Sequence, residues 1–449
     1  MPLPLVEAAA ATGKGWARGR RRGGLVNAMK RGARFLYPLF LVVLLLLRVP
    51  DIVRRPQFWA DEGSFFFREA WCQGGSSLFT PYAGYFHTIH RLVALAVSYV
   101  PPLYAPALYC LVALTLTFVV LSLLMSDRLA LPYKPLLALA LVIVPHDGEV
   151  FVNLTNIQWL LSLGLLALVF MEPGSRRALV ADTVYVLLVG LTGPFMILVA
   201  PLFLVKLWLE RANVVARPRL LLLSALGVVI AALQMYSVHF TNEEREFQYA
   251  SLRDCLVDIA THAGNVAVMT VSKIFGSAME GALALASLKP MKDLTIGAIE
   301  YFSIACGVLF LVVLIYDLFR NRRYVFEKLA FAYFAAMLVF ATIYRNSFLP
   351  STPFDSFLFS MSDRYFYIPK VMLLWIVILF LRNKVSGVVS YVFMAAILVT
   401  SLTGFRRDPW VDFNWPYWSK RVAAHEAVEV PINPVGWKID LRCAERPVR

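Results

Sequence analysis

Apolar runs of membrane-spanning length, separated by short basic stretches, recur along this chain and constrain its fold more than any other feature. A helix of ~20 apolar residues crosses the hydrocarbon core of a bilayer. The runs, several of them shorter, lie near residues 35–49, 103–125, 133–146, 157–171, 178–193, 195–210, 218–237, 296–318, 327–344, 368–382 and 385–403. They predict an all-α fold, a polytopic transmembrane helix bundle of about eleven spans.

The composition agrees with a membrane protein. Of 449 residues, 59% are hydrophobic and only 16% are charged, whereas soluble domains average about 25% charged residues. A formal net charge of +14 would suit a nucleic-acid binder. The basic residues, however, gather at the ends of the apolar runs, where they orient membrane spans. We therefore expect the lipid bilayer as a partner and exclude nucleic acid.

The basic stretches also predict an orientation. We place the arm at residues 1–34, which is rich in arginine and lysine, in the cytoplasm. Every loop on the same side is then basic, and its residues are Arg128 and Lys134; Arg176 and Arg177; Lys206, Arg211, Arg217 and Arg219; Arg320, Arg322, Arg323 and Lys328; and Arg382 and Lys384. The positive-inside rule thus predicts the N-terminus inside and the C-terminus outside.

This topology divides the chain into an arm, a membrane domain and a tail. The regions are the arm 1–34, the transmembrane domain 35–403 with outer loops 50–102, 238–295 and 345–367, and the outer tail 404–449. Two stretches inside the outer loops are apolar enough to raise the question of further crossings. We expect 86–100 to be a juxtamembrane or re-entrant helix, because a crossing there would turn the next basic loop outward. We expect 255–290 to lie at the membrane interface.

Short motifs add little. The five cysteines are scattered and none forms a CxxC pair, so a zinc site is not indicated. Cys72 and Cys443 both fall outside the membrane, where a disulfide is chemically possible. Asn153-Leu154-Thr155 fits a glycosylation sequon, a triplet that is frequent by chance. The chain has no GxxxxGK[ST] loop, so ATP hydrolysis is not expected.

An acidic pair stands out in the first outer loop. Asp61 and Glu62 follow the first span, between Trp59 and the run Phe65-Phe66-Phe67. Aromatic neighbours lower the local dielectric and can raise the pKa of a carboxylate toward the range of a general base. We expect this pair to be catalytic. Two carboxylates could also bind a divalent metal ion, Mg²⁺ or Mn²⁺, and we keep that interpretation open.

Further polar residues gather at the outer ends of the predicted spans. They are His87, His90 and Arg91; Asp147, Glu149, Asn153 and Asn156; Arg345; and Asp363, Arg364 and Tyr365. The first three share one face of a helix, because they are spaced three and four apart. Simpler interpretations stay open: the aromatic residues, with Tyr82, Tyr85 and Trp159, can be interface anchors, and the Asp363–Arg364 neighbours can be a structural pair.

The first outer loop resembles that of the GT-C superfamily, multi-helix membrane glycosyltransferases that use polyprenyl-phosphate sugars as donors. Asp61-Glu62 is similar to the acidic motif of their first outer loop, often Asp-Glu or Asp-Asp. Their His-Pro-Pro helix start is only loosely matched, since His87 and His90 have no adjacent proline. The runs WADEGSFFFREAW, SLFTPYAGYFHTIHRLVA, NLTNIQW and LTGPF look like a bacterial membrane-protein family grouped near this superfamily.

The resemblance implies an inverting glycosyltransferase. It would move a sugar from a polyprenyl-phosphate carrier to a hydroxyl of an envelope glycan or protein, on the outer face of the bacterial cytoplasmic membrane. Asp61 would deprotonate the acceptor, with Glu62 as metal ligand or second acid. Arg91, Arg345 and Arg364 are candidates to stabilise the departing phosphate. The pocket for sugar or acceptor would be lined by His87, His90, Asp147, Asn153, Asn156, Asp363 and Tyr365.

Other classes of protein remain as alternatives: a transporter or flippase, an O-antigen polymerase, an acyltransferase, and an interaction scaffold without chemistry. A transporter or flippase of lipid-linked sugars would carry functional charges at mid-membrane. The predicted span interiors are nearly free of charge, and the exceptions, Asp182 and Glu300, lie near span ends. An O-antigen polymerase would have several arginines in a large late outer loop, whereas 238–295 holds only Arg245 and Arg253. Polar residues gathered on one face favour the transferase.

Overall fold

The computed structural model describes residue 32 and residues 34–241, 251–287, 295–346 and 362–443. Within these residues the chain is mostly helical and contains one two-stranded sheet. The predicted helix bundle is confirmed as the fold class, whereas the number of spans and their orientation stay predictions. The predicted arm 1–34 lies almost entirely outside the described residues.

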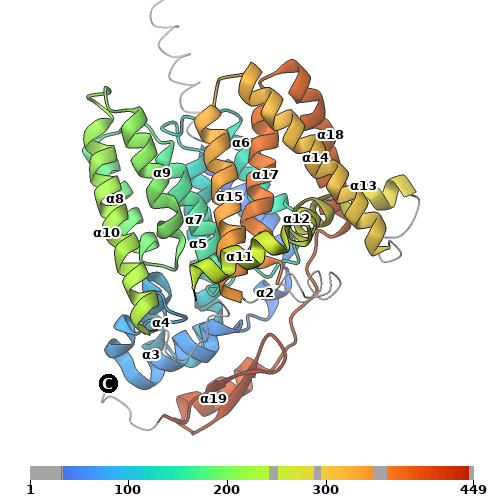
Figure 1. The fold of residues 1–449 in the computed structure, drawn as a ribbon. Coiled ribbons are helices and arrows are strands. Elements are labelled where there is room, and N and C mark those ends of the chain that lie inside the picture. The colour runs from blue at the N-terminus through green and yellow to red at the C-terminus, as the bar shows by residue number, and fades with distance from the viewer. Residues whose placement is uncertain (1–31, 33, 242–250, 288–294, 347–361, 444–449) are drawn as a thin grey trace, which may run out of the picture.

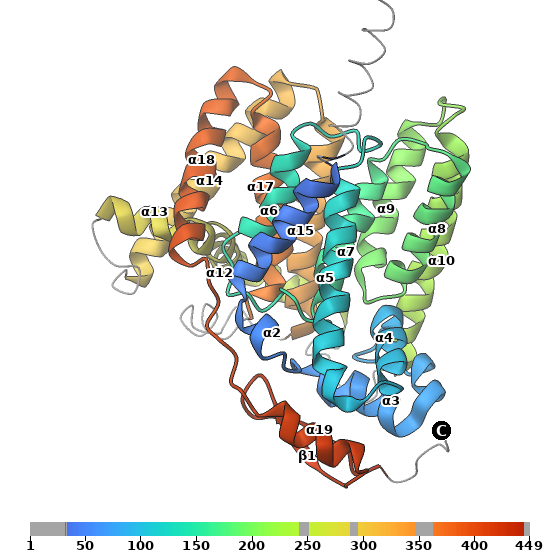
Figure 2. The same ribbon diagram turned by 180° about the vertical axis from the view of Figure 1, so that it is seen from behind.

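Upright helices packed side by side form the bundle (Figures 1 and 2). They are a first helix at residues 34–48, α5 (Ala105–Leu124), α6 (Lys134–Ile143), α7 (Ile157–Val169), α8 (Arg176–Gly190), α9 (Phe195–Leu209), α10 (Arg217–Thr241), α14 (Ile296–Arg320), α15 (Val325–Asn346), α17 (Arg364–Phe380) and α18 (Lys384–Thr403). Almost every residue of α7 and α17 is buried. These two helices form the centre of the bundle because they are apolar on nearly all sides.

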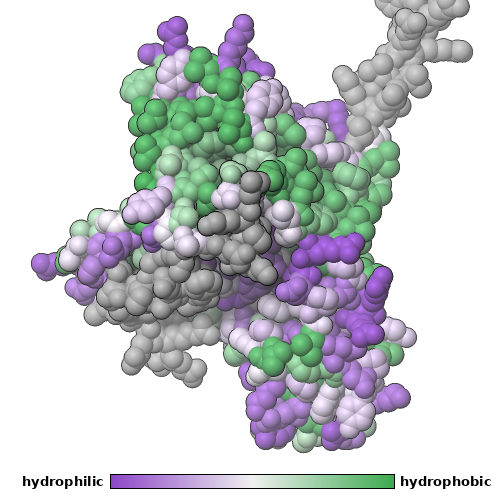
Figure 3. Space-filling model, turned by 90° about the vertical axis from the view of Figure 1, so that its right-hand side faces the viewer, coloured by the Kyte–Doolittle hydropathy of each residue, from purple (hydrophilic) through white to green (hydrophobic). Residues whose placement is uncertain are grey.

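Six described helical stretches are long and apolar enough to cross a membrane. They are Pro102–Leu124, Arg217–Phe240, Ala263–Ser287, Gly297–Arg320, Val325–Tyr344 and Lys384–Thr403. The predicted spans at 133–146, 157–171 and 195–210 are shorter apolar helices. Figure 3 shows apolar side chains covering much of the bundle, with polar side chains above and below them. Such a band is what a bilayer environment requires.

Two apolar stretches of the predicted outer loops differ from the upright helices, one in direction and the other in length. One contains α11 (Leu252–Thr261), α12 (Ala263–Val271) and α13 (Ser277–Ser287); α11 and α12 run across the bundle in Figure 1, and α13 lies at its side. Their direction agrees with the interface position expected for 255–290, although Ala263–Ser287 is long enough to cross. The other is α4 (Thr88–Ser98), whose 11 residues rise only about 16 Å, half of the hydrocarbon thickness.

Buried charges near the predicted inner turns are paired. Asp182 of α8 accepts hydrogen bonds from Arg128, through two nitrogens at 3.0 and 2.6 Å, and from Arg219 Nε at 2.7 Å. Asp317 of α14 is paired with Lys328 of α15. Both arginines and Lys328 belong to the predicted basic loops. Asp182, an exception among the nearly charge-free span interiors, is therefore the partner of two loop arginines.

The opposite end of the bundle carries a cap made of the segments that are predicted to lie outside; we call it the outer cap. The cap contains α2 (Asp51–Arg54), α3 (Arg68–Gln73), α4, and a tail with α19 (Trp415–Ala423), β1 (Glu429–Ile432) and β2 (Trp437–Asp440). The strands form an antiparallel hairpin in which Ile432 pairs with Trp437. A disulfide joins Cys72 to Cys443, which confirms the possible bridge. The tail thus returns to the first outer loop and is fastened there.

Candidate active site

A cavity of about 620 Å³ lies between the outer cap and the bundle. Its walls come from the first outer loop, from the turn before α7 and the start of α7, from α9 and α15, from the start of α17, and from the tail. Its polar lining residues are Asp61, Tyr82, Tyr85, His87, Glu149, Thr155, Asn156, Gln158, Thr342, Arg364 and Tyr365. Segments far apart in the sequence therefore contribute to one cavity.

The cavity divides the predicted site residues into two groups. Those that line it are Asp61, His87, Asn156, Arg364 and Tyr365, together with Glu149. Those that do not line it are Glu62, His90, Arg91, Asp147, Asn153 and Asp363. The side chain of Arg345 lies outside the described residues. The polar residues predicted at the outer span ends are thus brought together only in part. Those of the second group support the walls of the cavity.

Asp61 lines the cavity from a strained turn. Ala60 has a φ of 44°, in the left-handed region that residues with a side chain rarely adopt. The turn is held because the Ala60 N–H donates to the carbonyl of Asn433 at 2.5 Å. The Tyr82 hydroxyl donates to Asp61 Oδ1 at 2.6 Å. The carboxylate of Asp61 is therefore fixed in position by both the backbone and a neighbouring side chain.

Glu62 has the opposite environment, although it is the next residue. Its side chain is 0% exposed, and its two oxygens accept the N–H groups of Trp59 at 2.7 Å and Leu154 at 2.8 Å. The Thr155 hydroxyl accepts the Glu62 N–H and donates to the Trp59 carbonyl. Glu62 therefore fastens the turn that carries Asp61 to the turn before α7. These contacts are those of a residue that positions Asp61, and the expected role of Glu62 as metal ligand or second acid stays a prediction.

Burial also shifts the protonation of Glu62. It raises the pKa of Glu62 to about 8, although hydrogen bonds from backbone N–H groups, including those of Trp59 and Leu154, favour the charged form. A carboxyl whose pKa is raised on folding stabilises the protein while it is protonated. This stabilisation is lost as pH rises through the folded-state pKa.

We expect the stability of the wild-type protein to fall between about pH 7 and pH 9, and that of Glu62→Gln to fall less. Thermal unfolding in detergent at several pH values measures both slopes. The range avoids the titration of His90, whose burial lowers its pKa to about 4 and contributes a slope of opposite sign at lower pH. Equal slopes in the two proteins would contradict the assignment to Glu62.

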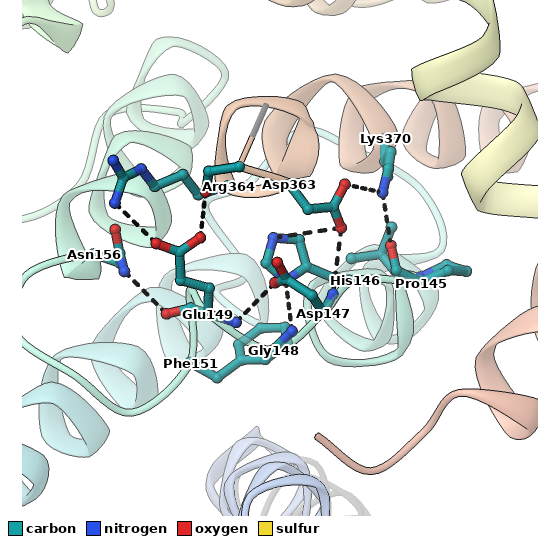
Figure 4. A network of polar contacts seen from close by, with 12 residues as sticks. Pro145, His146, Asp147, Gly148, Glu149, Phe151, Asn156, Asp363, Arg364 and Lys370 are labelled. Atoms are coloured by element: carbon teal, nitrogen blue, oxygen red, sulfur yellow. Dashed lines mark hydrogen bonds and ion pairs between the residues drawn. The ribbon is translucent and has the colours of Figure 1, made fainter. Parts of the chain in front are cut away.

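Arg364 brings a fixed positive charge to the cavity. Its Nη1 pairs with Glu149 Oε1 at 2.8 Å (Figure 4), and its guanidinium lies 5.1 Å from the ring centre of Tyr365. Burial lowers the pKa of Arg364, but attraction to Glu149, Tyr365 and Asp61 outweighs burial and raises it. Glu149 also accepts the Ser362 hydroxyl. A cation and the carboxylate of Asp61 thus line the same cavity.

Asp363 belongs to a second network behind this pair (Figure 4). Asp363 Oδ1 lies 2.6 Å from Lys370 Nζ, and Oδ2 lies 3.8 Å from His146 Nε2. Asp147 Oδ1 lies 2.9 Å from His146 Nδ1. Burial raises the pKa of Asp363, but the charges of Lys370 and His146 outweigh it and lower it. The suggested Asp363–Arg364 pair is therefore wrong, because each of the two residues pairs elsewhere.

The histidine face of α4 is mostly structural. His90 is fully buried, and its Nε2 lies 3.4 Å from the Thr155 carbonyl. Arg91 is buried and pairs with Glu69. His87, at the start of the helix, lines the cavity, with its Nε2 3.2 Å from the Tyr82 carbonyl. Only the first of the three predicted residues therefore reaches the site.

Asn153 and Asn156 shape the turn that faces Asp61. Asn153 is 0% exposed and donates to the carbonyls of Glu149 and Phe151. Asn156 donates to the same Glu149 carbonyl at 2.9 Å and lines the cavity. The sequon at Asn153 is thus inaccessible to glycosylation in the folded protein.

The described carboxylates do not form a ready metal site. Both oxygens of Glu62 accept backbone N–H groups, and Glu62 is buried away from the cavity that Asp61 lines. His146, Asp147 and Asp363 lie close enough to share an ion, but Lys370 already compensates the charge of Asp363. A divalent ion at Asp61 and Glu62 stays a prediction, and no step of the reaction below is derived through it.

Two features of the site were missed at the level of sequence. Pro434 and Trp437, from the hairpin of the tail, line the cavity. Gln234 of α10 is fully buried and donates to the carbonyls of Gly190 and Gly193. Gln234 therefore holds the turn at residues 191–195 (LTGPF). The sequence signal that could have indicated this role is the single amide side chain inside the apolar run 218–237. The tail gave no signal beyond its content of Trp and Pro.

Comparison with known proteins finds no matching family model, and no curated protein or solved structure is significantly similar to the chain. The function is therefore argued from the cavity itself.

Proposed function

We propose that this protein is a membrane glycosyltransferase that moves a sugar from a polyprenyl-phosphate carrier to an acceptor hydroxyl, with inversion at the anomeric carbon. The observation that carries the proposal is the single cavity lined by both Asp61 and Arg364. A base must remove the proton of the acceptor. A fixed cation must stabilise the phosphate that departs. One cavity offers a group for each task.

In the proposed step, the acceptor oxygen attacks the anomeric carbon while the bond from that carbon to the phosphate oxygen breaks. Asp61 accepts the proton of the attacking hydroxyl. Arg364 pairs with the phosphate as its negative charge grows, and a planar guanidinium can offer two N–H groups at once. Glu149 keeps Arg364 in place through the 2.8 Å ion pair. Because one displacement occurs, the configuration inverts.

The two sides of the cavity suit a lipid-linked donor. Apolar residues of α9 and α15, among them Leu198 and Leu338, form the wall that lies within the bundle. Trp59 and Trp437 come from the outer cap. A donor with an apolar chain and a charged phosphate needs both environments. The arrangement therefore supports entry of the carrier from the membrane and of the acceptor from water.

The Cys72–Cys443 disulfide supports an outer location for the site. Disulfides form and persist in oxidising compartments and are rare in the cytosol. The basic residues of the opposite end agree with a cytoplasmic position for the other side. We therefore propose that the cavity faces the exterior of the bacterial cytoplasmic membrane.

A deletion strain tests the proposal against its alternatives. The measurement is mass spectrometry of surface glycans, glycoproteins and lipid-linked saccharides, with the deletion strain complemented by the wild-type gene or by an empty vector. We expect one sugar to be lost from a surface molecule on deletion and to return with the wild-type gene. The corresponding donor should accumulate.

Each other outcome points to a different class. Complete lipid-linked saccharides that accumulate on the inner leaflet would identify a flippase. Glycans that keep every sugar but become shorter chains would identify a polymerase. Surface molecules that do not change at all would overturn the glycosyltransferase proposal.

A further inference from the structure

The hairpin of the tail forms part of the cavity wall, and its tip carries an aromatic side chain. The tip connects β1 to β2 through residues 433–436, and Trp437 begins the second strand. The Trp437 N–H donates to the carbonyl of Pro434 at 3.0 Å, which closes the turn. Trp437 and Pro434 line the cavity that Asp61 also lines. The tail therefore contributes to the wall of the cavity that the proposed base also lines.

The hairpin is held against the turn that carries Asp61. Asn433 accepts the Ala60 N–H, and the Asn433 N–H donates to the carbonyl of Phe58 at 3.3 Å. The Ser64 hydroxyl donates to the Lys438 carbonyl at 2.8 Å. A side chain at Gly63 would force the hairpin side chains to shift, because an added Cβ would lie 2.8 Å from Ile432 Cδ1. Trp437 is thus placed relative to Asp61 by several contacts.

The tail side of the cavity is rich in aromatic rings. Trp437 is 38% exposed, and Trp59, Tyr82 and Tyr85 line the same cavity. Trp59 is itself stacked on Trp410 of the tail, with ring centres 4.7 Å apart. Exposed aromatic faces bind flat apolar surfaces. Pyranose rings offer such a surface in the C–H groups of one face, with hydroxyls at the rim.

We propose that Trp437 is a specificity-determining residue that stacks on a saccharide acceptor and presents one of its hydroxyls to Asp61. The inference rests on the proposed function and deepens it, because it assigns the acceptor to the saccharides rather than to protein hydroxyls. The donor reaches the cavity along the apolar wall of α9 and α15. The acceptor occupies the side under the hairpin, where the aromatic rings lie.

Binding of simple glycosides to the full-length protein in lipid nanodiscs tests the inference. The probes are the methyl pyranosides of glucose, mannose and galactose, with a serine-containing pentapeptide as the competing class. Saturation-transfer-difference NMR reports which probe protons contact the protein. The variants are Trp437→Ala, Trp437→Phe and Val435→Ala. Val435 is the matched control, because it is exposed at the same hairpin tip and does not line the cavity.

We expect at least one glycoside to bind the wild-type protein and to bind Trp437→Ala about tenfold more weakly. Trp437→Phe and Val435→Ala should bind it nearly as the wild type does. Peptide mapping of the Cys72–Cys443 disulfide in each variant shows that the hairpin is still in place. Unchanged glycoside binding in Trp437→Ala, binding of the peptide alone, or binding of no probe would overturn the inference.

The experiment is independent of the glycan analysis, because it needs no donor and no turnover. Glycoside binding through Trp437 in a protein whose deletion leaves all surface glycans unchanged would defeat the proposed function but keep the saccharide site. Loss of a sugar on deletion, without glycoside binding through Trp437, would keep the proposed function but defeat the saccharide site.

Discussion

Replacement of Asp61 by asparagine is expected to slow sugar transfer by ~10²–10⁴-fold, the usual contribution of a general base. Asparagine keeps the size of the side chain. It also keeps an oxygen that can accept the hydrogen bond that the Tyr82 hydroxyl donates to Asp61 Oδ1 at 2.6 Å in the wild type. It cannot take a proton from the acceptor. The initial rate of transfer from the donor that accumulates in the deletion strain, in membranes with equal amounts of protein, measures the effect.

Asp412→Asn is the matched control for this experiment. Asp412 also lies in the outer cap, accepts a hydrogen bond from Gln57 at 3.3 Å, and does not line the cavity. It should transfer sugar at nearly the rate of the wild type. A rate for Asp61→Asn close to that of Asp412→Asn would remove Asp61 from the catalytic role.

Replacement of Asp182 by alanine is expected to destabilise the folded protein by about 3–5 kcal/mol, as is typical when one partner of a buried ion pair is removed. Asp182 is only 3% exposed and balances two arginines, Arg128 and Arg219. Alanine would leave the buried Arg219 and the partly exposed Arg128 without this partner. Thermal unfolding in detergent, followed by the aggregated fraction, measures the loss.

Glu210→Ala provides the comparison for Asp182→Ala. Glu210 pairs with Lys206 one helical turn away, at 3.0 Å, where both side chains are partly exposed, and helical pairs at this spacing contribute about 0.3–0.5 kcal/mol. We expect it to unfold close to the wild-type temperature. A similar small change for Asp182→Ala would show that the buried cluster contributes little to stability.

The acidic pair shows how far sequence reasoning reached into the site. Asp61 and Glu62 carry the same chemistry and are adjacent, so composition could not separate their roles. The fold separates them, because the turn at Ala60 points one carboxylate to the cavity and buries the other against the N–H groups of Trp59 and Leu154. Long-range hydrogen bonds therefore decided which carboxylate is available for catalysis.

Asp363 and Arg364 are also adjacent in the sequence and are separated in role by their long-range partners. Sequence alone offered a structural pair of neighbours, or two binding residues. In the fold, Arg364 pairs with Glu149 at the cavity. Asp363 pairs with Lys370 in the separate network that includes His146 and does not line the cavity. Consecutive residues at the start of a helix point in different directions, so partners from other elements override sequence adjacency.

Sequence by itself determined the helical class, the apolar stretches, and the clustering of basic residues and of candidate site residues in separate connecting segments. Hydropathy and charge clusters are local properties, and a bilayer selects for them directly. Only the tertiary structure decided that Asp61, Asn156, Arg364 and Trp437 share a cavity, and that Glu62 and Asn153 support it from behind. These residues lie far apart in the chain, and their meeting depends on helix packing, a hairpin and a disulfide, which no local pattern specifies.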